Sequence, residues 1–61
     1  MTTVVEFKEA VSFLGQNRKL IKLTEREELE FKNDFISIVN KNNQSKTYIP
    51  ICNVLGIRFS N

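Results

Sequence analysis

The scarcity of residues that can cross-link the fold constrains this chain more than any other feature. Its 61 residues include one cysteine and no histidine. A chain this short buries only about 60% of its unfolded surface, so its core is marginal unless a disulfide, a metal or a partner supports it. One cysteine cannot form an internal disulfide, and a single thiol without histidine makes no zinc site. We therefore expect one small domain over residues 1–61, no metal and no cofactor, and association as the remaining source of stability.

The N-terminal segment has two interpretations. Thr3 followed by Glu6 has the form of a helix capping box. Apolar residues then recur at helical spacing: Val4, Phe7, Val11 and Leu14. Gly15 offers the left-handed conformation in which many helices end. The pattern predicts a helix over residues 4–14, and the alternative is a strand over residues 2–7, because two β-branched valines adjoin there.

From residue 17 onward the hydrophobic period changes to two, which is typical of strands. Short alternating runs predict five strands, at residues 19–24, 28–32, 35–39, 47–49 and 54–59. Pro50 has no N–H to donate to a sheet, so it belongs at a strand end or an edge. Residues 51–53 can then form one tight helical turn. We interpret this interruption as a corner at which the sheet folds over on itself.

Together these elements predict an α+β fold, an N-terminal helix packed on a small, strongly bent antiparallel sheet of about five strands. Three features carry a resemblance at fold level: the alternating segment Leu20–Leu23, the pair Asp34-Phe35 before an apolar strand, and the final corner. This order of elements resembles the Sm-like and related small barrels, in which an N-terminal helix caps a strongly bent five-stranded sheet. The resemblance implies an architecture, and no binding residues follow from it.

Catalysis is not expected from this composition. Histidine, the usual general base, is absent, and no glycine-rich phosphate loop occurs. The acidic run includes Glu28 and Glu30, but their alternation with apolar residues places both on the solvent side of a strand. Carboxylates exposed to solvent in this way have no sheltered substrate to act on. We therefore expect a protein that is not an enzyme.

Protein recognition is the function we expect from the predicted sheet. A small sheet with exposed edges can add a strand from a partner or pair with a second copy of itself. An outward arginine near the closing corner discourages uncontrolled pairing and fits an acidic neighbour. The candidate protein-contact residues are Arg58, Tyr48, Glu28 and Glu30. The sequence thus predicts a small binding or regulatory module whose partner is another protein or itself, as a homo-oligomer.

Nucleic-acid binding by a small β-barrel is the alternative function. The net charge of +2 is compatible with nucleic-acid binding but is weak support for it, since basic binding domains usually carry a far larger excess of positive charge. The candidate contacts are cations that could follow a phosphate backbone and one aromatic residue that could stack on a base: Arg18, Lys19, Lys22, Lys41, Lys46 and Tyr48.

No apolar stretch approaches the about 18 residues that a membrane span requires. The N-terminus also lacks a basic region leading into an apolar run. We therefore expect a cytoplasmic protein with no membrane contact.

Overall fold

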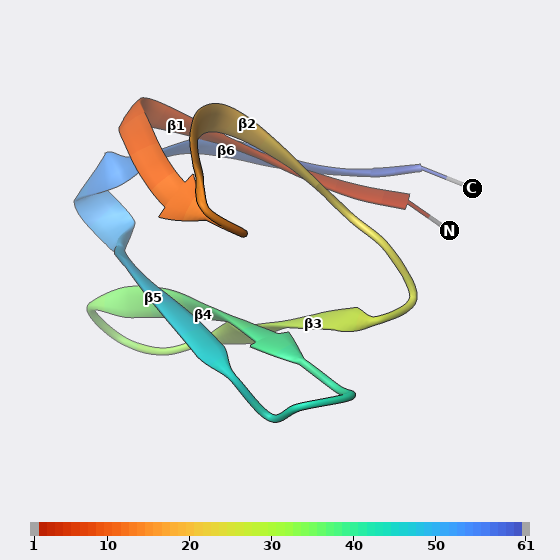
Figure 1. Cartoon of the computed structure of the whole chain (residues 1–61). Helices are drawn as coiled ribbons and strands as arrows, with labels where there is room; N and C mark the ends of the chain where they lie inside the picture. The colour runs from red at the N-terminus through yellow and green to blue at the C-terminus, as the bar shows by residue number, and fades with distance from the viewer. Residues whose placement is uncertain (1, 61) are drawn as a thin grey trace.

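A computed structural model describes residues 2–60 of the chain, and strands make up most of them (Figure 1). The elements are β1 (Thr2–Phe13), β2 (Gln16–Leu23), β3 (Glu27–Phe31), β4 (Phe35–Asn40), β5 (Lys46–Pro50), the 3-10 turn η1 (Ile51–Asn53) and β6 (Val54–Ser60). Antiparallel pairing joins them into two sheets, sheet A in the order β2-β1-β6 and sheet B in the order β3-β4-β5. Figure 1 shows the two sheets lying one above the other.

The predicted N-terminal helix is wrong. Residues 2–13 form strand β1, and residues 2–60 contain no α-helix. The fold is therefore nearly all β instead of α+β, and its strands form two sheets instead of one bent sheet. The resemblance to the Sm-like barrels included the capping helix, so the structure does not support it. The tight turn at residues 51–53 and the position of Pro50 at the end of β5 are confirmed.

A bulge in β1 explains why the hydrophobic spacing of this segment resembled that of a helix. In the first half of the strand, Val5 and Phe7 point into the core and are 0% and 1% exposed. The pairing with β2 then shifts, so that residues 7–10 stand opposite Lys19 alone. The extra residues bend the strand and leave Glu9 exposed, so that the next residue of β1 to pack against the core is Val11. Core residues at positions 7 and 11 therefore have the four-residue spacing that a helix would also give.

The hairpin between β1 and β2 turns on Leu14 and Gly15. Phe13 pairs with Gln16, so these two residues form the whole loop, and both have positive φ, 52° and 75°. Positive φ at both positions is the mark of a type I′ turn, which favours Asn-Gly. Gly15 adopts this conformation freely. Leu14 does not, and its side chain is 78% exposed, so nothing compensates for the strain.

Replacing Leu14 by asparagine should therefore stabilise the protein. We expect a gain of about 1 kcal/mol, because asparagine tolerates the left-handed conformation better than leucine does. Thermal unfolding followed by circular dichroism should show a melting temperature higher by about 4–8 °C. Gly15→Ala is the control and should lower the melting temperature. A Cβ at this position meets nothing within 4 Å, so the loss would come only from the positive φ, which alanine disfavours. A Leu14→Asn protein that melts lower than the parent would contradict the turn.

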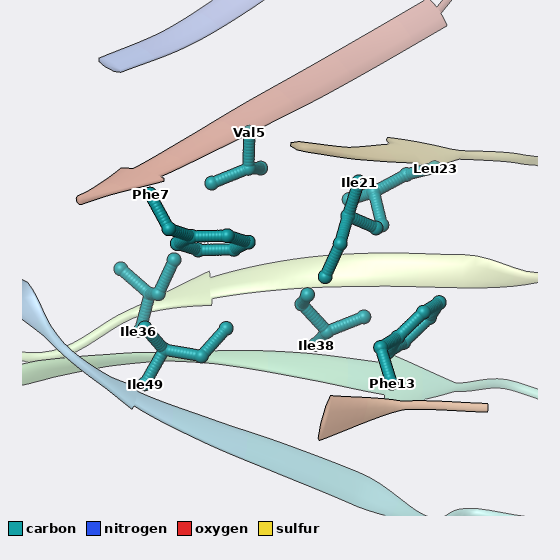
Figure 2. Packing of buried hydrophobic residues seen from close by; sticks show 8 residues of the cluster. All are labelled: Val5, Phe7, Phe13, Ile21, Leu23, Ile36, Ile38 and Ile49. Atoms are coloured by element: carbon teal, nitrogen blue, oxygen red, sulfur yellow. The ribbon is translucent and has the colours of Figure 1, made fainter. Parts of the chain in front are cut away.

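One core joins the two sheets. The buried side chains are Val5, Phe7 and Phe13 from β1, Ile21 and Leu23 from β2, Ile36 and Ile38 from β4, and Ile49 from β5. Figure 2 shows Phe7 pointing toward Ile36 and Ile49, while Ile21 points toward Ile38. Each sheet therefore has an inner face that packs in the core and an outer face that points away from it.

An asparagine side chain ties the bulge of β1 to the corner before β6. The Glu9 N–H donates to Asn53 Oδ1 at 2.9 Å, and Asn53 Nδ2 donates to the Glu9 carbonyl oxygen at 3.2 Å. Such a pair of bonds replaces the two that a neighbouring strand would supply. The bulge is thereby held in place by a residue 44 positions away in sequence.

Among residues 2–60, no helix has the length and apolar character needed to cross a membrane.

Candidate protein-binding surface

The outer face of sheet B is covered at its centre, because Ser37 and Val39 of β4 are only 1% and 8% exposed. In β4, Ile36 and Ile38 point into the core, so Phe35, Ser37 and Val39 point outward. Directly paired residues of an antiparallel sheet lie on the same side. The outer face of sheet B therefore consists of Glu28 and Glu30 from β3, Phe35, Ser37 and Val39 from β4, and Lys46, Tyr48 and Pro50 from β5.

Two rows of side chains cross this face. One row runs from Glu28 through Val39 to Lys46, and the next runs from Glu30 through Ser37 to Tyr48. In both rows a carboxylate stands on β3, and a hydrogen-bond donor, the Lys46 ammonium or the Tyr48 hydroxyl, stands on β5. The face is therefore acidic along one edge and donor-bearing along the other, with β4 between them.

An aromatic pair stands at one end of the face. The rings of Phe35 and Tyr48 meet edge to face, with centroids 5.4 Å apart and planes at 70°. Phe35 is half-buried, whereas Tyr48 is 62% exposed. Tyrosine combines a large apolar ring with a polar tip, which is why it is enriched at protein interfaces. This pair offers an apolar anchor whose orientation is already fixed.

The charged residues of the face are only loosely engaged with one another. Lys46 Nζ lies 3.8 Å from Glu30 Oε1, and their side chains are 44% and 37% exposed. Exposed pairs of this kind contribute about 0–1 kcal/mol. Both side chains can therefore exchange this contact for one with a partner at little cost.

Ser37 lies at the centre of the face and is buried there. It is 1% exposed, and its Oγ has no bonding partner within residues 2–60. Its neighbours in the row, Glu30 and Tyr48, flank it on either side. A buried hydroxyl left unsatisfied costs about 1–3 kcal/mol, so native structures rarely keep one without a reason.

The structure brings Tyr48, Glu28 and Glu30 together on the outer face of sheet B and separates Arg58 from them. Arg58 lies on the outer face of sheet A, in the row where Val4 pairs with both Arg58 and Lys22. Lys46, which the sequence placed among the nucleic-acid contacts, lies on the outer face of sheet B together with Tyr48, Glu28 and Glu30.

Other basic candidates gather around a cleft at the β1–β2 hairpin. Arg18 and Lys22 line this open cleft of ≈ 740 Å³, together with Arg26, and the buried residues Phe13 and Ile21 also contribute to its lining. Glutamates 25 and 27 lie there too. The positive charge around the cleft is therefore partly balanced.

The turn between β2 and β3 borders this cleft and is closed by side chains instead of glycine. Glu27 Oε1 accepts hydrogen bonds from the Thr24 N–H and from Thr24 Oγ1, each at 2.9 Å. Thr24 Oγ1 in turn accepts from the Arg26 N–H at 3.2 Å. The carboxylate of Glu27 is thus engaged in the turn. Lys19 and Lys41 do not line the cleft, so the predicted cations do not form one continuous patch.

Sequence reasoning missed Ser37 and Val39 as surface residues of functional interest, and Arg26 as part of the cleft. The signal for the first two was present in the segment Phe35–Val39. This segment carries apolar residues at both parities, which indicates a strand whose two faces are both covered. Arg26 gave no such signal, because its position depends on the side-chain bonds of the turn.

Comparisons of the chain with protein-family models, with curated proteins and with solved structures gave no match. Within residues 2–60, no group of three or more histidine, cysteine, aspartate or glutamate side chains is placed to hold a metal ion.

Proposed function

We propose that the chain is a small non-enzymatic binding module with a regulatory role, and that it acts through protein contacts on the outer face of sheet B. The observation that carries the proposal is the exposed ring of Tyr48, fixed by Phe35 and bordered by loosely paired charges. Protein interfaces commonly combine an aromatic anchor with polar residues at the rim. The outer face of sheet B has both parts.

Selection of displayed random peptides on the immobilised protein tests this proposal without knowledge of the natural partner. Selected peptides tend to settle on the surface best suited to bind, so independent peptides should compete with one another. Their binding should be lost on Tyr48→Ser and retained on Arg58→Ser, because Arg58 lies on the other sheet. Peptides that depend on Arg58 and tolerate Tyr48→Ser would contradict the assignment of the surface.

Nucleic-acid binding is the second candidate, and the cleft that joins Arg18, Lys22 and Arg26 supports it. Binding of a fluorescent, random single-stranded oligonucleotide at low and high salt separates the two functions. If the cleft binds phosphates, affinity falls steeply with salt and Arg18→Gln weakens it, because released counterions drive such binding. Under our proposal the oligonucleotide does not bind with a steep salt dependence, and Arg18→Gln has no effect on peptide binding.

We propose the cytoplasm as the compartment. Cys52 is a free and exposed thiol in the 3-10 turn, and an exposed thiol persists in a compartment that is kept reducing. Exposure of the protein to an oxidant should give a covalent dimer through Cys52 that a thiol reductant reverses.

A further inference from the structure

We propose that the partner of the outer face of sheet B is a second copy of the chain, related to the first by a two-fold axis parallel to β4. This inference rests on the proposal that this face binds protein. It commits to one occupant and to one arrangement, and both follow from the order of charges across the sheet.

The charge pattern of the face is complementary to itself about that axis. A two-fold axis along β4 lays β3 of one copy over β5 of the other and keeps each row at its own level. Glu28 of one copy then faces Lys46 of the second copy, because both belong to the Val39 row. In the adjoining row, Glu30 faces the hydroxyl of Tyr48, which can donate to a carboxylate. Each contact occurs twice in the dimer.

The other two-fold arrangement of the same face is unfavourable. An axis running across the strands would lay β3 over β3, so that Glu28 and Glu30 of one copy met the same residues of the other. Like charges placed together disfavour an interface and thereby select against a wrong arrangement. The carboxylates along β3 therefore favour the axis along β4 over the axis across the strands.

The interface is small, so the dimer is weak. Sheet B contributes three short strands of five, six and five residues. This places the buried area at the low end for specific complexes, below about 1,200 Å² in total. We expect a dissociation constant in the micromolar range or higher, and a melting temperature that rises with protein concentration because association favours the folded chain.

Charge reversal followed by mixing tests the arrangement. Glu28→Lys and Lys46→Glu should each raise the dissociation constant of the homodimer about 10-fold or more, measured by sedimentation equilibrium, because each change affects two contacts. An equimolar mixture of the two variants should form a heterodimer close to wild-type affinity, since both of its contacts again join opposite charges. Arg58→Glu, a charge reversal on sheet A, is the matched control and should leave association unchanged.

Three outcomes would overturn the inference. Wild-type protein that remains monomeric at about 1 mM would exclude a second copy as the partner, while peptide selection would still judge the binding surface independently. Variants that weaken the dimer singly but do not recover on mixing would contradict the axis. Weakening by Arg58→Glu with no effect of Glu28→Lys would assign association to sheet A.

Discussion

Replacing Phe7 by alanine should unfold most of the protein at room temperature. The Phe7 side chain is 1% exposed and points from β1 toward Ile36 and Ile49 of the opposite sheet (Figure 2). Truncating a buried phenylalanine costs about 3–5 kcal/mol through lost burial and the cavity left behind. A domain of this size has a total stability of roughly 3–9 kcal/mol, so the loss is comparable with the whole.

Circular dichroism and a melting curve measure this effect, with Phe31→Ala as the matched control. Phe31 is 60% exposed at the end of β3, so its truncation should cost less than about 1 kcal/mol. A Phe7→Ala protein that melts within a few degrees of the parent would place Phe7 outside the core. The packing of sheet A on sheet B described above would then be wrong.

Replacing Asn53 by alanine should give the second large loss of stability. The change removes both bonds to the Glu9 backbone and leaves the bulge of β1 without its support. Two such hydrogen bonds contribute about 1–2 kcal/mol in this half-buried position. The melting temperature should fall by about 5–15 °C.

Asn43→Ala is the control for Asn53→Ala. Asn43 Oδ1 accepts one bond, from the N–H of Ser45 within an exposed turn, so its loss should be much smaller. Asn53 joins parts of the chain that are far apart in sequence, whereas Asn43 joins near neighbours. Equal effects of the two substitutions would mean that the Asn53 bonds do not hold the bulge.

The strands beyond residue 17 could be predicted from the sequence because short alternating or apolar runs there are separated by polar turn residues. β1 could not, because its bulge leaves Glu9 exposed between Phe7 and Val11, so that the alternation is interrupted and the spacing resembles that of a helix. The division into two sheets could not be predicted from the sequence either. It depends on the pairing of Val5 with both Ile21 and Ile57, and a local pattern carries no information about such distant partners.

Only part of the candidate surface could be predicted, because Ser37 and Val39 were missed and Arg58 lies on the other sheet. Alternation placed Glu28 and Glu30 on the solvent side of their strand, and Tyr48 was named as a candidate contact. Their assembly into rows depends on the register set by the turns on either side of β4, and this register emerged only with the structure. The burial of Ser37 depends on the longer side chains around it. The sequence therefore did not predict that its hydroxyl would be buried and unsatisfied.

Backbone amide chemical shifts recorded from low micromolar concentration to about 1 mM test the central claim most directly, because each amide reports on its own surroundings. We expect concentration-dependent shifts at Ser37, Val39, Lys46 and Tyr48, with the amides of Val4 and Arg58 unchanged. Shifts confined to Val4, Arg58 and their neighbours in sheet A, with β4 unchanged, would contradict the assignment of the outer face of sheet B as the contact surface.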